Sequence, residues 1–214
     1  MTDLLRITEI FYSLQGEADS VGWPTVFIRL TGCPLRCEYC DTAYAFSGGS
    51  PMSIAQIIAE TQRYLTCYVT VTGGEPLAQP GCLPLLRQLV DLGYRVSLET
   101  SGALNVANVD PRVIKVMDLK TPASGEVARN RYENLQYLNT QDQIKFVISD
   151  AVDYDWAKHM LNIYNLAERC QVLFSPVSGR MSARELADKI LADQLPVRFQ
   201  MQLHKYLWDD ARGK

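Results

Sequence analysis

Segments rich in apolar and β-branched residues alternate with amphipathic segments along most of this 214-residue chain. The first kind predicts strands, and the second predicts helices that bury one apolar face. Alternation of this kind is typical of βαβ units, in which helices cover neighbouring parallel strands. We therefore expect one α/β domain over residues 1–214, built as an incomplete TIM-like barrel of mostly parallel strands.

The expected elements are short and closely spaced. Ser53 is a plausible N-cap for the first helix, and Gly93 is a plausible residue just beyond the end of the second. The stretch between Thr100 and Gln143 is less regular, so helices could be missed there. Strands are expected over residues 7–14, 26–31, 68–72, 95–99, 113–117, 143–148, 171–174 and 197–201, and helices over 53–65, 83–92, 154–167 and 183–192.

The most distinctive polar motifs follow predicted strands. In a parallel α/β sheet, functional sites gather at the loops that leave the carboxyl ends of strands. These motifs are therefore expected to share one site, although any loop tends to be polar and rich in glycine. They occupy residues 33–40, 72–76, 99–102, 118–120, 175–177 and 204–206.

The first of these loops carries Cys33, Cys37 and Cys40 in a C-x3-C-x2-C spacing. A four-iron cluster held by three thiolates keeps one iron without a protein ligand, so that iron can bind a small molecule. The alternative is structural zinc, which nearly always takes four protein ligands. The chain has no pair-like spacing to supply them, and we expect its remaining cysteines to be buried, inert thiols. These are Cys67, Cys82 and Cys170.

Composition excludes several other classes of protein. The net charge is −3 and no basic stripe is visible, which argues against nucleic-acid binding as the main activity. No apolar run approaches the roughly 20 residues needed to span a bilayer. The N-terminal residues lack a basic segment followed by an apolar one, so we expect a cytoplasmic protein without a membrane partner.

The cysteine spacing resembles that of the radical S-adenosylmethionine (SAM) enzymes, and the Gly73-Gly74-Glu75-Pro76 turn resembles the motif that receives the cofactor in that superfamily. A narrower resemblance, to the 7-carboxy-7-deazaguanine synthases, runs from about Glu9 to Leu207. Its motifs are Leu14-Gln-Gly-Glu17, Phe27-Ile-Arg-Leu30, Cys40-Asp-Thr42, Thr70-Val-Thr-Gly-Gly-Glu-Pro76, Glu99-Thr-Ser-Gly102 and His204-Lys-Tyr-Leu207.

That resemblance implies a role for each matching residue. Cys33, Cys37 and Cys40 would hold a [4Fe-4S] cluster, and Thr42 would bind Mg²⁺. The implied SAM contacts are Tyr39, Cys40, Asp41, Gly74, Glu99, Ser101, Asp118, Leu119, Lys120, Phe174, Ser175, Pro176 and Val177. The implied substrate contacts are Leu14, Gln15, Gly16, Glu17, Arg29, Thr72 and His204.

Elementary chemistry is compatible with two of these roles. Magnesium prefers oxygen ligands and keeps several waters, so a threonine and a substrate carboxylate are a reasonable set. Arg29 lies in an apolar strand, where an unpaired charge is costly, and its planar fork suits a carboxylate. A lone histidine such as His204 is more often structural, and only the resemblance favours a ligand role for it.

The chain departs from the family pattern in two places. Ala18 stands where the family usually has glycine, and a methyl group there could shift the loop that contacts substrate. The loop Asp118-Leu-Lys120 replaces the Ser-Pro-Lys of some members, which weakens its assignment as a SAM contact.

The family's reaction converts 6-carboxy-5,6,7,8-tetrahydropterin to 7-carboxy-7-deazaguanine with loss of ammonia, on the route to queuosine. The protein would position the substrate while the cofactor supplies the radical chemistry. An electron donor such as flavodoxin or ferredoxin and a homodimer are further expectations of the resemblance. Two alternatives remain open at this point: an activase that makes glycyl radicals on a partner protein, and a zinc-stabilised binding module.

Overall fold

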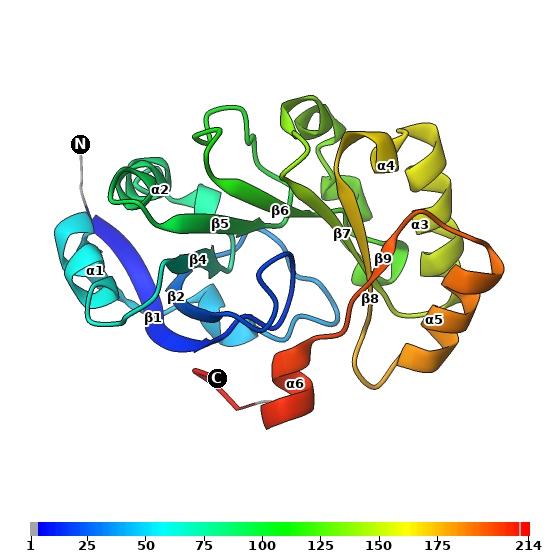
Figure 1. Cartoon of the computed structure of the whole chain (residues 1–214), viewed down its shortest axis with the longest axis horizontal. Helices are drawn as coiled ribbons and strands as arrows, with labels where there is room; N and C mark the ends of the chain where they lie inside the picture. Colours follow the sequence, from blue (N-terminus) through cyan, green and yellow to red (C-terminus); the bar gives the residue numbers. More distant parts are fainter. Residues whose placement is uncertain (1–3, 210) are drawn as a thin grey trace.

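The computed structural model describes residues 4–209 and 211–214, and one curved sheet dominates it (Figure 1). The order of its nine strands is β3-β1-β2-β4-β5-β6-β7-β8-β9, so the sheet is open. The strands are β1 (Leu4–Leu14), β2 (Pro24–Leu30), β3 (Ser50–Ser53), β4 (Tyr68–Gly73), β5 (Arg95–Thr100), β6 (Ile114–Asp118), β7 (Gln143–Ile148), β8 (Gln171–Pro176) and β9 (Arg198–Phe199). All of these strands belong to one sheet.

Most strand pairs are parallel, as expected. The strands from β2 and β4 through β9 pair in parallel with their neighbours. The exception is β1, which runs antiparallel to both β2 and β3. The parallel strands bring the loops at their carboxyl ends to one edge of the sheet, which is the arrangement that the motif positions predicted.

Helices pack on the outer side of the curved sheet. Figure 1 shows α1 to α5 around the outside, while α6 and the C-terminal end lie across the opposite side. The helices are α1 (Ile54–Thr61), α2 (Cys82–Asp91), α3 (Ala151–Ile163), α4 (Leu166–Arg169), α5 (Ala183–Ala192) and α6 (Leu203–Trp208). Short 3-10 turns are η1 (Ala43–Phe46), η2 (Pro76–Ala78), η3 (Pro122–Ser124), η4 (Val127–Arg129) and η5 (Tyr132–Tyr137).

Local sequence explains where these helices begin and end. The Ser53 hydroxyl accepts a hydrogen bond from the Gln56 backbone N–H at 3.2 Å, and the Gln56 side chain accepts one from the Ser53 N–H at 2.8 Å. This capping box confirms Ser53 as the N-cap of α1. Gly93 follows α2 with a φ of +88°, as its expected place beyond the helix end requires.

The core lies between the helices and the sheet. In α2, Leu85, Leu86 and Leu89 are fully buried and belong to one cluster with Val71 and Leu98 of the central strands. Burial of each such side chain stabilises the fold by about 1.5–3 kcal/mol relative to leaving it exposed. No described helix is long and apolar enough to cross a membrane.

Several expectations differ from the structure. Helix α1 ends at Thr61 rather than Leu65, whose side chain is fully exposed. The strand expected over 197–201 is reduced to β9. The expected helix over 154–167 begins earlier, at Ala151, because Asp150 caps it through the Asp153 N–H. Cys67 is exposed, so the expectation that it is buried is wrong, whereas Cys82 and Cys170 are buried.

Candidate active site

A cavity of about 510 Å³ opens at the carboxyl ends of the parallel strands. Its wall brings together residues that are far apart in the chain, from Phe11 of β1 to Lys214 beyond α6. Nineteen of the residues expected at the site line this cavity: Leu14, Gln15, Gly16, Glu17, Arg29, Cys33, Cys37, Tyr39, Cys40, Asp41, Thr42, Thr72, Gly74, Glu99, Ser101, Asp118, Lys120, Val177 and His204.

Four expected SAM contacts do not line the cavity. Leu119 and Phe174 are buried, and the Phe174 ring packs against Phe146 and Tyr154 in the core. Pro176 also lies outside the wall. The hydroxyl of Ser175 is buried and has no hydrogen-bond partner among the described residues. The structure therefore brings only Val177 of the expected 174–177 segment to the cavity.

The loop after β2 presents three free thiols to the cavity. Cys33, Cys37 and Cys40 are each half-buried, and burial raises the pKa of Cys33 and Cys37. No set of three or more His, Cys, Asp or Glu side chains in the described chain converges to hold a single metal ion. A donor set of three thiols on one loop, facing a cavity, fits a cluster with one open iron.

The glycine pair after β4 allows the cysteine loop to pack closely. A Cβ atom on Gly74 would collide with the carbonyl oxygen of Gly32 and lie 3.1 Å from the Cβ of Cys33. The Glu75 N–H also donates to the Gly32 carbonyl at 2.8 Å. Gly74 therefore lets the backbone after β4 form one side of the thiol site.

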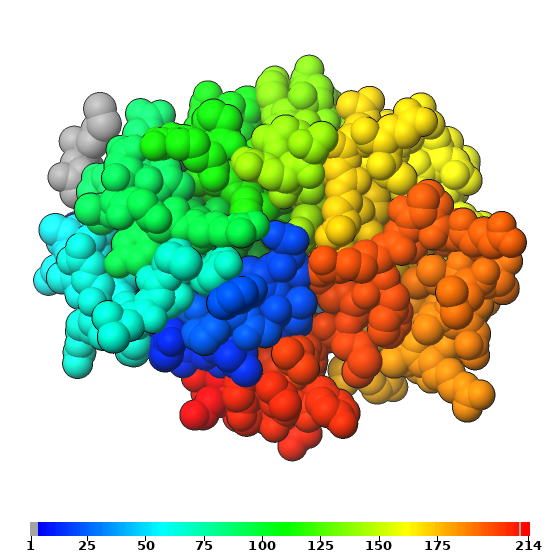
Figure 2. Space-filling model, viewed as in Figure 1, coloured from blue at the N-terminus to red at the C-terminus, as the bar shows by residue number. Residues whose placement is uncertain are grey.

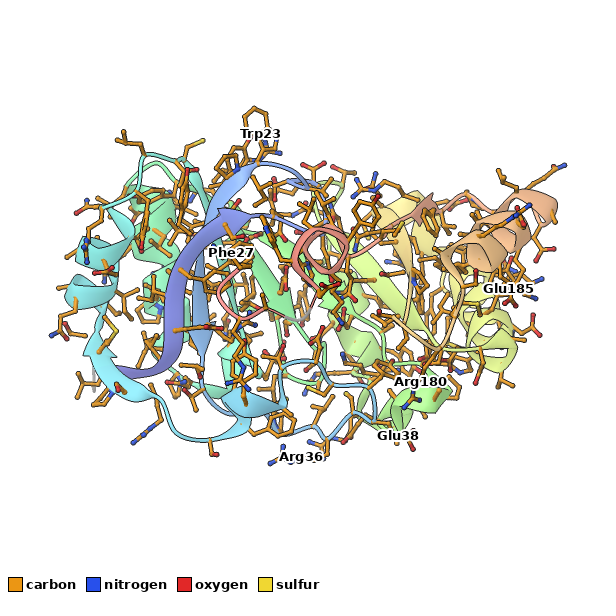
Figure 3. All side chains as sticks on the ribbon, turned by 90° about the horizontal axis from the view of Figure 1, so that it is seen from below. Trp23, Phe27, Arg36, Glu38, Arg180 and Glu185 are labelled. Atoms are coloured by element: carbon orange, nitrogen blue, oxygen red, sulfur yellow. The ribbon has the colours of Figure 1, made fainter. Side chains whose placement is uncertain are left out.

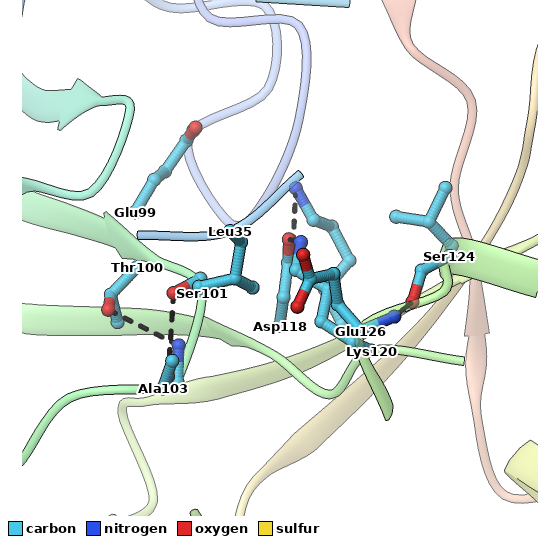
Figure 4. A network of polar contacts seen from close by, with 12 residues as sticks. Leu35, Glu99, Thr100, Ser101, Ala103, Asp118, Lys120, Ser124 and Glu126 are labelled. Atoms are coloured by element: carbon cyan, nitrogen blue, oxygen red, sulfur yellow. Dashed lines mark hydrogen bonds and ion pairs between the residues drawn. The ribbon is translucent and has the colours of Figure 1, made fainter. Parts of the chain in front are cut away.

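Glu75 joins the loops that follow β4 and β5. Its fully buried carboxylate accepts hydrogen bonds from the Thr100 hydroxyl at 2.9 Å and from the N–H and hydroxyl of Ser101 at 2.7 and 2.5 Å. The Ser101 hydroxyl is thus engaged with protein. The Glu99 side chain, in contrast, extends away from Thr100 and Ser101 and lines the cavity (Figure 4).

A row of polar side chains crosses neighbouring strands inside the cavity. Arg29 on β2 pairs in register with Thr72 on β4, and the Thr72 hydroxyl donates to Glu99 on β5 at 3.2 Å. The Arg29 Nε donates to Glu9 at 2.7 Å, and the Tyr44 hydroxyl donates to the same Glu9 oxygen at 2.7 Å. Glu9 was not anticipated from the sequence. It orients Arg29 so that the guanidinium is held at a fixed place in the wall.

A second group of charges centres on Lys145 of β7. Its ammonium lies 2.6 Å from a Glu17 oxygen and 3.4 Å from an Asp118 oxygen, while Lys120 lies 2.6 Å from the other Asp118 oxygen. Burial alone would raise the pKa of Glu17, but the adjacent Lys145 lowers it below its ordinary value. Glu17 is therefore an anion in this site. Lys145 was not anticipated either.

The C-terminal segment holds the loop formed by residues 15–18. The Gln202 side chain donates to Glu17 at 2.8 Å, the Leu203 N–H donates to the Gly16 carbonyl at 3.0 Å, and Gln200 accepts from the Ala18 N–H at 2.6 Å. Figure 2 shows these blue and orange-red segments side by side on the surface.

The fit between Gly16 and His204 is especially close. A Cβ on Gly16 would collide with the imidazole of His204. Burial lowers the pKa of His204, which favours a neutral ring. Gln15 is buried, and its side-chain amide donates to the Thr70 hydroxyl at 2.9 Å, so this side chain supports the loop from beneath.

The backbone conformation of Ala18 explains why the family usually has glycine at this position. Its φ is +62°, and the residue is buried. The left-handed conformation costs an L-residue roughly 1–2 kcal/mol, a penalty that glycine does not have. The loop keeps its course despite the methyl group, because Ala18 donates to Gln200 and its carbonyl accepts from Arg198.

We expect Ala18→Gly to stabilise the protein by about 1 kcal/mol, because it relieves a positive-φ strain. Chemical denaturation of the metal-free protein measures this change. The matched control is Ala187→Gly inside α5, which should destabilise the protein by roughly 0.5–1 kcal/mol. If both Ala18→Gly and Ala187→Gly destabilised the protein, the inference that Ala18 is strained would be wrong.

Thr42 and Asp41 lie at the cavity mouth beyond the thiols. The Thr42 hydroxyl donates to Asp41 at 2.8 Å, and Lys205 of α6 lies 3.2 Å from the other Asp41 oxygen. Burial would raise the pKa of Asp41, but Lys205 and the Thr42 hydrogen bond lower it to about 2. At the rim of the same loop, Glu38 pairs with Arg180 at 3.5 Å (Figure 3).

Two stacked rings form an apolar part of the wall. The centroids of Phe11 and Phe27 are 4.8 Å apart and the rings are nearly parallel. The Arg29 guanidinium lies 5.7 Å from the Phe11 centroid. A flat heterocycle with a carboxylate could stack near these rings and pair with Arg29. Further lining residues that we did not anticipate include Lys145, Arg180, Gln202 and Lys214.

An open parallel half-barrel with three thiols at the carboxyl ends of its strands defines the radical SAM class of enzymes, and residues 27–118 match the family model described as the Radical SAM superfamily. The 7-carboxy-7-deazaguanine synthase of Chlorobaculum tepidum is 45% identical over 98% of this chain and 97% of its own length. That of Koribacter versatilis is 43% identical over 95% and 97%. The chain belongs to the 7-carboxy-7-deazaguanine synthase family.

The similarity extends to a solved structure. The crystal structure of QueE from Escherichia coli superposes with a TM-score of 0.77 at 25% identity, and the match covers 94% of this chain and 95% of that one. The expected fold class, an incomplete barrel of mostly parallel strands, is confirmed.

Proposed function

We propose that this enzyme converts 6-carboxy-5,6,7,8-tetrahydropterin to 7-carboxy-7-deazaguanine with loss of ammonia. The observation that carries the proposal is the composition of one cavity. Three thiols face the same space as Arg29, the anionic Glu17 and the stacked pair Phe11–Phe27. These groups suit a carboxylated pterin. Arg29 is a cation for the carboxylate, Glu17 is an anion for the amine-bearing edge of the ring, and the Phe11–Phe27 pair is a flat apolar wall.

Each part of the substrate has a counterpart in the wall. Arg29, held at its Nε by Glu9, directs the rest of its guanidinium to the substrate carboxylate. Glu17 accepts hydrogen bonds from the amino edge of the pterin, with Lys145 keeping it anionic. Leu14, Gly16, Thr72 and the neutral His204 complete the substrate pocket, and Gln15 supports it from below.

The cofactors would occupy the adjoining part of the cavity. Cys33, Cys37 and Cys40 would hold the cluster, and the backbone around Gly74 with the Asp118 and Lys120 side chains would contact SAM, since all of these residues line the cavity. When bound, these groups would supply the hydrogen-atom abstraction chemistry that the reaction needs at C6 of the substrate. The chain itself orients C6, excludes water and holds the charges that surround the reacting ring.

Thr42 supplies an oxygen ligand to Mg²⁺, with the substrate carboxylate as its second anchor. We expect Thr42→Ala to leave iron content unchanged and to raise the magnesium concentration needed for half-maximal turnover by about tenfold or more. The control is Thr66→Ala, which removes a hydroxyl that bonds the Pro24 carbonyl away from the cavity. An unchanged magnesium response in Thr42→Ala would remove this residue from the metal site.

The direct test of the function is an anaerobic incubation of reconstituted protein with SAM, dithionite, Mg²⁺ and the carboxytetrahydropterin. Formation of 7-carboxy-7-deazaguanine, detected by mass spectrometry, together with one equivalent of ammonia supports the proposal. Absence of both with an intact cluster overturns it. A homodimer, a donor of the flavodoxin or ferredoxin type and a cytoplasmic location are further proposals from the family resemblance; light scattering tests the first of them.

A further inference from the structure

Glu99 differs from the other carboxylates that line the cavity. Glu17 and Asp118 each have a lysine ammonium within 4 Å, and Asp41 has one at 3.2 Å. Among residues 4–209 and 211–214, no cationic nitrogen lies within 4 Å of the Glu99 carboxyl group. Within the part of the chain that the structure describes, its one side-chain hydrogen bond comes from the Thr72 hydroxyl at 3.2 Å. The carboxyl group thus faces the cavity with one oxygen free.

The charges around Glu99 are already balanced without it. Lys145 and Lys120 neutralise Glu17 and Asp118, which approach from the 15–18 loop and from β6. Arg29 of β2 is neutralised by Glu9. Burial raises the pKa of Glu99 above its ordinary value, and Glu17 and Asp118 add to that rise, whereas Lys145 and Arg29 oppose it. Glu99 therefore keeps a proton at a pH where Glu17 is ionised.

Glu99 also lies at a suitable distance from the expected position of the reacting atoms. It is two strands away from Arg29, with Thr72 between them, and neighbouring strands are about 4.8 Å apart. In the substrate, the carbon that carries the carboxylate is C6, and C6 is bonded to the nitrogen, N5, that leaves as ammonia. A carboxylate held by Arg29 therefore places C6, with N5 and C7 on either side of it, in the part of the cavity that Glu99 lines.

We propose that Glu99 is a catalytic residue, the proton donor and acceptor for the loss of ammonia. This inference rests on the proposed function and deepens it. It also replaces the sequence-based expectation that Glu99 contacts SAM.

The step is balanced without an additional reactant. After ring contraction, N5 is a free amino group on C6. The C6–N5 bond breaks, its electron pair goes to N5, and the Glu99 proton completes ammonia. The C7–H electron pair then forms the C6–C7 double bond of the aromatic product, and the released proton returns to the Glu99 carboxylate. General acid–base catalysis of this kind typically contributes 10²–10⁴-fold.

The test is the E99Q variant, which keeps the side-chain shape but cannot transfer a proton. With substrate deuterated at C6, we expect transfer of deuterium into SAM-derived 5′-deoxyadenosine or SAM to continue at a rate comparable with the wild type. Formation of 7-carboxy-7-deazaguanine should fall by at least ~100-fold. A compound heavier than the product by one ammonia should accumulate.

Glu17→Gln is the matched control, because it makes the same change at a carboxylate paired with Lys145. It should raise KM for the pterin without accumulation of the heavier compound. Product formation by E99Q within tenfold of the wild type overturns the proposal, as does loss of SAM binding or of deuterium transfer, which would support a SAM contact. Wild-type protein that forms no product overturns the proposed function as well.

Two measurements keep the proposal testable if E99Q folds poorly. Glu99→Asp retains the acid but withdraws it by one methylene, so it should release both product and the heavier compound; product alone at the wild-type rate contradicts the proposal. Carbon-13 NMR of metal-free protein labelled at glutamate carboxyls should show one carboxyl group titrating well above the ordinary glutamate value of about 4.3, and Glu99→Asp should remove that resonance. Ordinary titration of every glutamate contradicts it.

Discussion

Loss of iron, of SAM cleavage and of product formation together is the expected result of Cys37→Ala. Cys37 is the middle thiol of the cavity loop, and two thiols cannot hold a four-iron cluster that needs three. We expect the loss to exceed the roughly 10–100-fold effect that is typical of changes to outer-shell partners of a metal site. Iron and sulfide content, visible absorbance and 5′-deoxyadenosine formation measure it.

Cys67→Ala is the control for this variant. Cys67 is a free thiol that is exposed outside the cavity, so its removal should leave the iron content and activity unchanged. The metal-free forms of both variants should have similar free energies of unfolding, since neither thiol makes a large packing contribution. A Cys37→Ala protein that retains its iron and cleaves SAM would disprove the ligand assignment.

Lys145→Met is expected to cause the largest loss of stability, about 3–5 kcal/mol in the free energy of unfolding. The side chain is 10% exposed and lies between Glu17 and Asp118, so its removal leaves Glu17 as a buried anion without a cation. Methionine matches the length of lysine, which limits the effect of a cavity. Urea denaturation of the metal-free protein measures the loss.

Two comparisons separate charge from packing in this result. Lys158→Met removes a lysine from a pair with Asp193 in which both side chains are more than a third exposed, and it should cost no more than about 1 kcal/mol. The double variant Lys145→Met with Glu17→Gln should recover part of the loss, because no unpaired anion remains. A loss below 1 kcal/mol in Lys145→Met alone would contradict the role of Lys145 as a buried counter-ion.

Local pattern was sufficient for most of the sheet but not for its edge. The strand over 143–148 and the helix over 183–192 were predicted with the bounds that the structure has, because each combines a clear apolar pattern with definite end signals. β3 was missed because Ser50–Ser53 has no apolar alternation and is a strand only through pairing with β1. Between Thr100 and Gln143, the irregular stretch forms 3-10 turns and one strand.

The site was predictable where a motif has a fixed spacing, and less so where tertiary contacts decide. The cysteines and Arg29 could be found from the sequence. The argument used for Arg29, that a charge in an apolar strand needs a partner, applies equally to Lys115 and Lys145. Only the structure separates them: Lys115 is paired with the fully buried Asp142 outside the cavity wall, whereas Lys145 lines the cavity.

The hydrogen bonds between the C-terminal segment and the 15–18 loop have a consequence for folding. The hydrogen bond from the Ala18 N–H to Gln200 and that from Gln202 to Glu17 join residues 182 and 185 positions apart, which makes them among the most non-local contacts of the described chain. Closing such a long loop costs more entropy than local pairing, so these contacts should form late. Opening of this segment would release the substrate side of the cavity and leave the thiol loop intact. In native-state hydrogen exchange, the amides of Ala18 and Leu203 should therefore exchange together, as one unit of lower stability than the central strands.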